Sequence, residues 1–263
     1  MLEFGEEALV LTHDAMVEGV HFLPGQSGED LAWKLVASNM SDLAAKGAQP
    51  IGVLLSYQMG EDEDDAAFLR GLQAALRRYG DAALLGGDTV SANGSRSLGL
   101  TAIGRATHQP VPSRSGARAG DSLWITGPVG AAMLGFEALK SGSGDSSFYR
   151  RGKALLVEGQ VLAPLVSAMM DVSDGLLLDS RRMAEASGLT LAIDRSAVPI
   201  ATDEDRRDEA LRWGEDYELL FTLPAGAVPP CSAHQIGVAL ERQAEPLLLD
   251  GKPPTGKLGY EHT

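Results

Sequence analysis

The chain has 263 residues, of which 44% are hydrophobic and 5% aromatic, and its formal net charge at pH 7 is −14. This length suffices for one large domain or two ordinary ones, and the negative charge gives no general attraction for nucleic acid or anionic lipid. A single cysteine, Cys231, excludes an internal disulfide and a cysteine-based metal site. Because the sequence has neither a membrane-length apolar run nor a signal-like start, we expect a soluble, cytoplasmic protein that binds neither nucleic acid nor membranes.

The first part of the chain is predicted to alternate strands and helices. Apolar runs predict strands over 8–13, 51–59, 82–87 and 97–106. Helical spacing of apolar residues predicts helices over 30–46 and 65–80, which Gly47 and Gly80 would end.

The segment 108–121 is rich in Pro, Ser, Gly and Arg, so we place a domain boundary there and expect domains over 1–109 and 110–263. The second domain is predicted to contain a strand over 121–127, helices over 128–139 and 153–167 around a flexible loop at 141–147, and a strand, turn and helix over 168–188. LTLAID, YELLFTLP and HQIGVAL predict three further strands. Because strands and helices are intermixed in both halves, the fold class is α/β or α+β.

Acidic residues recur at or near the ends of these predicted elements. A lone carboxylate at a buried strand end is costly unless something pairs with it. Each of these residues taken alone could be a turn or cap residue, but several together indicate a shared metal site. The positions are Asp14, Asp42, Asp88, Asp171, Asp174, Glu215 and Asp216.

The segment DVSDG (171–175) is the clearest of these motifs. On a strand, Asp171 and Ser173 would share a face, and Asp174 with Gly175 would turn the chain into a helix whose free N–H groups favour anions. Two carboxylates so close repel each other unless a hard cation such as Mg²⁺ lies between them. The alternative for Asp174 alone is a helix cap.

The segment ALLGGDTV (83–90) carries a second motif. Gly86 and Gly87 lack side chains, so a triphosphate could approach the backbone while Asp88 reaches its metal. Tight turns use the same residues, so GGD alone is a weak pattern.

Other common site patterns are absent from the sequence. It contains no G-x-x-x-x-G-K-[ST], H-E-x-x-H or G-x-S-x-G, and GPVGAAMLG (127–135) lacks the spacing of G-x-G-x-x-G. His21, in VEGVHF, is either a packed surface residue or part of a site.

Taken together, the motifs resemble those of the thiamine-monophosphate kinases, a family of the aminoimidazole-ribonucleotide-synthetase-like ATP-binding superfamily. DVSDG and GGD are shared across the superfamily, whereas VEGVHF, SDLAAKGA and GEDYELLF are typical of these kinases. The matching segments follow the family's order: LTHDAMVEGVHF (11–22), LVASNMSDLAAKGAQP (35–50), LLGGDT (84–89), SRSGARAGDSLWITGPVG (113–130), MMDVSDGLLLDSRRMA (169–184), GEDYELLFT (214–222) and GYEH (259–262).

The resemblance implies transfer of the γ-phosphoryl group of ATP to thiamine monophosphate, with several Mg²⁺ ions and no general base, because the acceptor is already a phosphate oxygen. It also implies a two-domain fold and a homodimer that pairs the N-terminal sheets. Carried over by position, Asp14, Asp42, Asp88, Asp171 and Asp174 would hold Mg²⁺, together with Thr12 and His13, although His13 stands where a hydroxyl residue is expected. ATP would contact Gly87, Asp88, Arg114 and Ser173, and the thiamine phosphate would contact His21, Asp216 and Tyr260.

One departure from the family concerns a G-D-D-A-A-type segment, whose aspartates bind metal in relatives. Here MLEF is followed directly by GEEALVLTHD, so either the protein has lost this segment or the sequence omits it. Two rival functions remain open: a sister activity in which ATP phosphorylates an amide or selenide, and a non-catalytic metal- or nucleotide-binding homologue. A selenide enzyme would be expected to carry a Cys or selenocysteine near its N-terminus, where this chain has none.

The strands 51–59 and 97–106 carry apolar residues on more than one face, more than a half-exposed sheet needs. We therefore expect part of this surface to be buried against a second copy of the chain. The residues concerned are Ile51, Val53, Leu54, Leu55, Leu98, Leu100 and Ile103.

Overall fold

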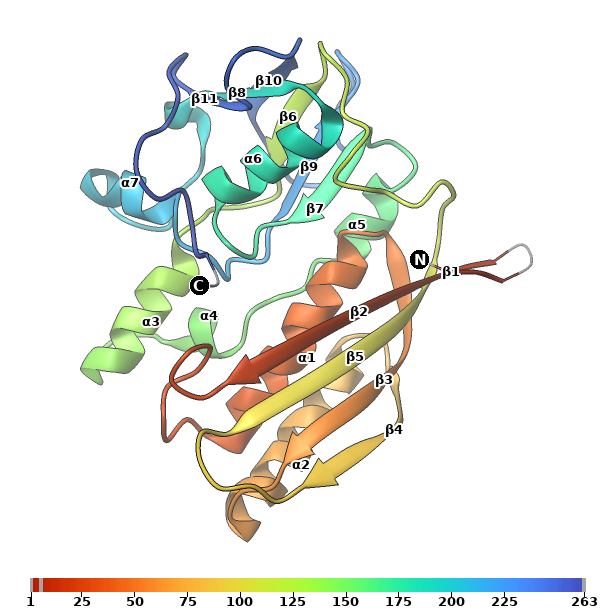
Figure 1. Ribbon diagram of the computed structural model, residues 1–263, viewed down its shortest axis with the longest axis vertical. Coiled ribbons are helices and arrows are strands. Elements are labelled where there is room, and N and C mark those ends of the chain that lie inside the picture. Colours follow the sequence, from red (N-terminus) through yellow and green to blue (C-terminus); the bar gives the residue numbers. More distant parts are fainter. Residues whose placement is uncertain (1, 5–6, 262–263) are drawn as a thin grey trace.

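Two β-sheets, each with its own helices, make up the computed structural model, which describes residues 2–4 and 7–261 (Figure 1). The join between Phe4 and Gly5, and His262 of the GYEH segment, therefore fall at or outside the edge of the described residues. No helix within the described ranges is long and apolar enough to cross a membrane.

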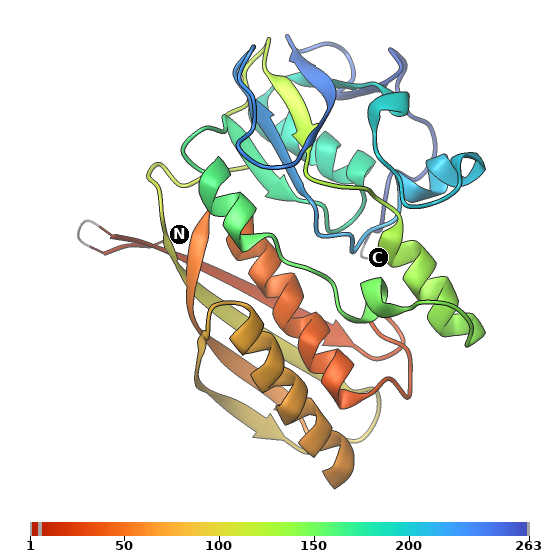
Figure 2. The ribbon, with the colours of Figure 1, turned by 180° about the vertical axis from the view of Figure 1, so that it is seen from behind.

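The N-terminal sheet has the spatial order β1-β2-β5-β3-β4. Its strands are β1 (Leu2–Phe4), β2 (Glu7–Val17), β3 (Ala48–Gln58), β4 (Ala83–Val90) and β5 (Ser97–Ala106). Helices α1 (Gly28–Ala44) and α2 (Asp62–Arg78) cover one face (Figure 2). Leu35 and Met40 of α1 pack there with Val53 and Leu100 of the sheet. Only β3 and β4 are parallel neighbours in this sheet, and α2 supplies the crossover that a parallel pair needs.

The opposite face of this sheet is left open by the described elements (Figure 1). Strand alternation puts Val10 and Met16 on the helix side and Leu11, 42% exposed, on the open side. Ile51 and Leu54 are also exposed there. Part of the expected excess of apolar residues is thus explained within one subunit, because Val53, Leu55, Leu98 and Leu100 are buried under the helices.

The C-terminal sheet has the order β11-β8-β10-β6-β9-β7. Its strands are β6 (Ser122–Ile125), β7 (Ala168–Asp171), β8 (Thr190–Ile193), β9 (Leu219–Leu223), β10 (His234–Leu240) and β11 (Leu247–Leu249). The helices of this half are α3 (Ala131–Ser141), α4 (Ser147–Arg150), α5 (Leu156–Leu162), α6 (Leu176–Ser187) and α7 (Arg207–Ala210), with short 3₁₀ turns at η1 (Arg195–Ala197) and η2 (Glu204–Arg206). Leu177 and Met183 of α6 pack against Leu191 and Ile236 of the sheet.

The two halves are joined by the segment 147–162, which packs on the N-terminal helices. The indole of Trp33 and the phenol of Tyr79 both donate to the carbonyl oxygen of Gly152, over 3.3 and 3.2 Å. Beside them, the buried carboxylate of Asp30 on α1 pairs with Arg150 at 2.5 Å and with Arg151 at 2.6 Å. These contacts, none of which lines the cleft described below, hold α1 against the segment 147–162.

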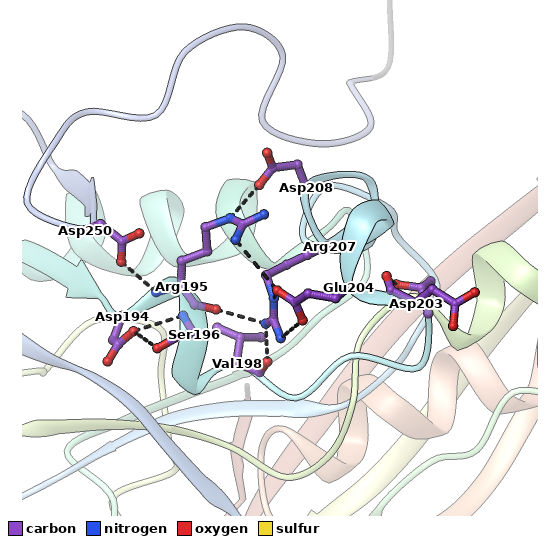
Figure 3. A network of polar contacts seen from close by, with 10 residues as sticks. Asp194, Arg195, Ser196, Val198, Asp203, Glu204, Arg207, Asp208 and Asp250 are labelled. Atoms are coloured by element: carbon purple, nitrogen blue, oxygen red, sulfur yellow. Dashed lines mark hydrogen bonds and ion pairs between the residues drawn. The ribbon is translucent and has the colours of Figure 1, made fainter.

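A polar network fixes the irregular stretch between β8 and α7 (Figure 3). The guanidinium of buried Arg207 donates to the carbonyl oxygens of Arg195 and Val198, at 2.9 and 2.6 Å, and to both carboxylate oxygens of Glu204. Arg195 in turn donates to Asp208 over 2.8 Å. This network anchors the chain just before residues 212–217, which enter the site.

Most predicted elements are present, but several boundaries were wrong. Strand β2 continues past Asp14 to Val17, and β4 continues through Gly86–Asp88 to Val90, so neither aspartate ends its strand. The helix predicted over 128–139 begins at Ala131, the one over 153–167 shrinks to α5, and the unexpected α4 begins at Ser147, the last residue of the expected loop. Strands β1 and β11 were not expected, because three-residue strands carry no readable period.

Gly87 allows β4 to pair closely with β3 beyond the predicted end of the strand. A Cβ on Gly87 would lie 1.9 Å from the carbonyl oxygen of Leu55 on β3, so glycine is required for the close approach of the two strands. The sequence predicts a phosphate contact for this glycine, and the structure also gives it a role in strand pairing.

Candidate active site

A cleft of about 720 Å³ opens between the two halves of the chain. Strand β2, helix α1 and the loop after β2 line it from the N-terminal half, and residues from α3, α4 and the loops after β7 and α7 line it from the C-terminal half. Eight of the predicted site residues line this cleft: His13, Asp14, His21, Asp42, Asp171, Ser173, Asp174 and Tyr260.

Four carboxylates converge at one end of the cleft from different elements. Asp14 lies on β2 and Asp42 on α1, where the hydroxyl of Thr12 donates to Asp42. Asp171 ends β7 and accepts a 2.7 Å hydrogen bond from Ser41 of α1, so the acidic end of the cleft is built across both halves. Asp174 follows in the loop after β7.

Burial and mutual repulsion make these carboxylates difficult to ionise. Burial and the neighbouring Asp42 carboxylate raise the pKa of Asp171 to about 8. The same two causes raise the pKa of Asp14, and burial raises that of Asp42 although Thr12 opposes it. Carboxylates in this state are the ligands that a hard divalent cation would stabilise in their ionised form.

Two basic residues approach the same carboxylates. Lys46 is electrostatically linked to Asp42 and Asp171, and Arg114 to Asp42. Burial, followed by the positive charge of Arg114, lowers the pKa of Lys46. Arg114 does not line the cleft, but its positive charge acts on the carboxylate of Asp42. This position is compatible with the predicted contact between Arg114 and a nucleotide phosphate.

The loop DVSDG is held differently from the sequence interpretation. Helix α6 begins only at Leu176, and the backbone N–H groups of Ser173 and Asp174 donate to the carboxylate of Asp179, over 3.0 and 2.9 Å. These N–H groups are therefore already used by the chain's own anion. The N-cap of α6 is Gly175, with no side-chain cap hydrogen bond, and the carboxylate of Asp174 pairs with Arg182, so the helix-cap alternative for Asp174 is also wrong.

Asp179 and its partners were missed by the sequence reasoning. Burial raises the pKa of Asp179 to about 6 even though it accepts two backbone N–H groups. An aspartate five residues beyond Asp174, followed by Arg182, was the available signal. The loop also needs Gly214, because a Cβ there would lie 2.3 Å from the carbonyl oxygen of Ser173.

The other end of the cleft is organised around His21 and Lys34. Nδ1 of His21 accepts the backbone N–H of Val17 at 3.1 Å, which places the ring proton on Nε2 in the neutral tautomer. The ammonium of Lys34 donates to the carbonyl oxygen of His21 at 2.8 Å and pairs with Glu215 at 2.8 Å. Glu215, noted from the sequence without a role, thus lines the cleft with a buried cationic partner.

Aromatic side chains form the wall next to this pair. The Phe136 ring lies 5.2 Å from the Tyr149 ring and 5.4 Å from the Trp213 ring, measured between centroids, and all three residues line the cleft. Tyr217 lines it as well, and burial together with Glu215 raises its pKa well above the usual value. None of these aromatic residues was singled out by the sequence analysis.

Five of the predicted site residues lie outside the cleft lining: Thr12, Gly87, Asp88, Arg114 and Asp216. Gly87 and Asp88 are exposed on edge strand β4. Asp216 accepts the backbone N–H groups of Gly130 and Ala132, at 2.6 and 3.0 Å, and so binds the N-terminus of α3. Burial raises the pKa of Asp216 to about 7.

His13 illustrates the effect of strand alternation. Its imidazole bonds to the hydroxyl of Thr101 at 2.9 Å on the neighbouring strand, whereas Asp14, the next residue of β2, interacts with Ser38 and Asp42 of α1. The side chain of His13 is thus on the opposite sheet face from the carboxylates. Within the described part of the chain, no three His, Cys, Asp or Glu side chains already stand in a geometry that would hold one ion.

Comparisons with known proteins agree with this architecture. The family model described as AIR synthase related protein, N-terminal domain, matches residues 1–106, and the one for the C-terminal domain matches residues 118–243. Thiamine-monophosphate kinase of Escherichia coli (strain K12) is 32% identical over 296 aligned positions, covering 98% of this chain and 87% of that protein. The chain belongs to the thiamine-monophosphate kinase family.

Solved structures of this family have the same fold. AaThiL complexed with AMPPCP and TMP superposes with a TM-score of 0.89 at 28% identity, covering 100% of this chain and 89% of that one. The thiamine-monophosphate kinase from Stenotrophomonas maltophilia K279a gives a TM-score of 0.84 at 31% identity, covering 94% and 87%. The family and fold class expected from the sequence are therefore confirmed, while the domain boundary at 109/110 stays a prediction.

Proposed function

We propose that this protein transfers the γ-phosphoryl group of ATP to thiamine monophosphate, giving thiamine diphosphate and ADP. The observation that carries the proposal is the cleft itself, in which carboxylates from both halves of the chain face a histidine and an aromatic wall in a member of this kinase family. The relative described as complexed with AMPPCP and TMP supports the same pair of substrates. The expected cytoplasmic location stays a prediction.

The acidic end fits Mg²⁺, because its donors are carboxylate oxygens whose burial and mutual repulsion a hard cation would relieve. Asp14, Asp42, Asp171 and Asp174 are the residues that would hold it. When bound, Mg²⁺ neutralises phosphate charge and aligns the reacting oxygens.

The remaining residues of the cleft bind and orient the two anions. Because Nδ1 of His21 accepts the backbone N–H of Val17, the neutral ring carries its proton on Nε2. An Nε2–H group is a donor suited to a phosphate oxygen of the acceptor. Arg114 adds positive charge near Asp42 for the nucleotide. The aromatic residues exclude water and offer ring faces to the heteroaromatic part of thiamine monophosphate.

We also propose a homodimer formed through the open face of the N-terminal sheet. Leu11 and Leu54 expose 42% and 41% of their surface there, and the whole of edge strand β4 is exposed. Gly87 and Asp88 lie on this strand, so their proposed contacts with ATP and metal depend on that assembly. Leu54→Asp should give a monomer in sedimentation, with Val157→Asp on α5, a 70% exposed position, as the matched control. A wild-type chain that sediments as a monomer at micromolar concentration would overturn this proposal.

The function is tested by incubating the protein with ATP, Mg²⁺ and thiamine monophosphate and measuring thiamine diphosphate and ADP in equal amounts. Phosphorylation of an amide-bearing nucleotide instead of thiamine monophosphate would favour the sister activity. Binding of ATP without turnover, measured by calorimetry, would favour the non-catalytic homologue.

A further inference from the structure

Among the described residues, Lys34 has one of the largest almost completely buried side chains, with 2% of its surface exposed. Burying an ammonium group is unfavourable unless several partners compensate for its lost hydration. Lys34 nevertheless lines the cleft, so its partners lie at the site and not in the core of a domain.

The partners of Lys34 come from three separate parts of the chain. Its Nζ donates to the carbonyl oxygen of His21 at 2.8 Å and pairs with Oε1 of Glu215 at 2.8 Å. It also lies 3.6 Å from the ring centroid of Tyr149, whose hydroxyl donates to the same His21 carbonyl at 3.1 Å. One cation therefore joins α1, the loop after β2, α4 and the loop that precedes β9.

Each of these contacts fixes a group that faces the cleft. The hydrogen bond from Lys34 to the carbonyl oxygen of His21 holds the peptide of that residue. The backbone N–H of Val17 donates to Nδ1 of the same residue, so the ring has little freedom. Glu215 adopts a left-handed backbone with φ of 66°, which is unfavourable for a residue with a side chain and needs support from its surroundings. The ion pair with Lys34 supplies that support.

We propose that Lys34 is a positioning residue for the acceptor substrate, acting through His21 and Glu215 without itself belonging to the metal or nucleotide end of the cleft. This inference rests on the proposed function. The carboxylates Asp14, Asp42 and Asp171 have partners of their own, so loss of Lys34 should leave the nucleotide end intact.

The test is steady-state kinetics of Lys34→Met, which keeps the length of the side chain but removes its charge. We expect the KM for thiamine monophosphate to rise roughly tenfold or more, with kcat and the KM for ATP changed by less than about threefold. Such a split shows the loss of a contact that binds the acceptor equally in the ground state and in the transition state.

Asp30→Asn is the matched control. Asp30 lies one turn earlier on α1 and forms a buried ion pair with Arg150, the neighbour of Tyr149, yet it does not line the cleft. It should lower the melting temperature and leave both KM values unchanged. If Lys34→Met lowers the melting temperature in the same way and leaves the KM for thiamine monophosphate unchanged, Lys34 is only structural and the proposal is overturned.

If Lys34→Met does not fold, the double variant Lys34→Met/Glu215→Gln removes the unpaired charge and is compared with Glu215→Gln alone. A higher KM for thiamine monophosphate in the double variant supports the proposal, and equal values overturn it. A wild-type protein that makes no thiamine diphosphate is a separate outcome, since it refutes the proposed function before any variant is compared.

Discussion

Replacing Asp171 with Asn should stabilise the metal-free protein at alkaline pH while abolishing most of its activity. Asp171 is 7% exposed, and its pKa of about 8 compares with 3.8 for the unperturbed group. Between these two values the folded state binds more protons than the unfolded state, so the free energy of unfolding falls as the pH rises from about 4 to about 8. The Asn side chain keeps the volume and can still accept the hydrogen bond from Ser41.

The size of the effect follows from the pKa difference. About four pKa units at about 1.4 kcal/mol each give an upper limit of about 6 kcal/mol above pH 8, and a fall of about 4 kcal/mol between pH 5 and pH 8.5. Asp171→Asn should remove most of that fall, because Asn does not titrate. Its turnover with Mg²⁺ should decrease by roughly two orders of magnitude or more, since a ligand of the phosphoryl-transfer site is lost.

The assay is urea unfolding in EDTA at both pH values, for the wild type and for Asp171→Asn. Asp174→Asn is the control, because Asp174 already has Arg182 as a cationic partner and its replacement removes an ion pair. Equal dependence of unfolding free energy on pH in the wild type and Asp171→Asn would refute the electrostatic argument. Full activity of Asp171→Asn would refute its role in holding metal.

Three further predictions follow from the same structure. Gly87→Ala should destabilise the fold by about 2 kcal/mol more than Gly86→Ala. Both residues have φ of 153°, but a Cβ on Gly87 would lie 1.9 Å from the carbonyl oxygen of Leu55, whereas the nearest atom to a Cβ on Gly86 is 3.8 Å away. Equal melting temperatures of the two variants would contradict this. Arg207→Met should lower the free energy of unfolding in urea by about 3 kcal/mol, because it leaves two backbone carbonyl oxygens without their buried donor. Arg195→Met, which breaks solvent-exposed ion pairs, should lower it by less than about 1 kcal/mol. Mg²⁺ should raise the melting temperature more at pH 8 than at pH 5, since protons compete with it for the carboxylates, and an equal rise at both would argue against a carboxylate site.

The order of helices and strands was predictable because each long element has its own hydrophobic period. Helices α1 and α2 and strands β3 and β5 were predicted to within a few residues for this reason. The ends of β2 and β4 were not, because Asp14 and Gly86–Asp88 look locally like turn residues. Pairing with β5 and β3 extends both strands through them.

The sequence by itself determined the chemistry of the cleft: carboxylates in family motifs, a histidine shortly after the first of them, a single cysteine, and no nucleophile elbow. Local order along the chain was enough for this, because each motif is read within a few residues. Only the tertiary structure decided which of these groups meet. Asp171 and Ser41 are 130 residues apart in sequence and 2.7 Å apart in space.

The same holds for the groups that the sequence misplaced or passed over. Asp216 bears the same carboxylate as Asp171, yet folding directs it to the N-terminus of α3. Lys34 reads as an ordinary helical lysine until α4 and the Glu215 loop close over it. The physical reason is that burial, charge pairing and pKa depend on neighbours that the chain brings together from distant segments, and no local pattern records those neighbours.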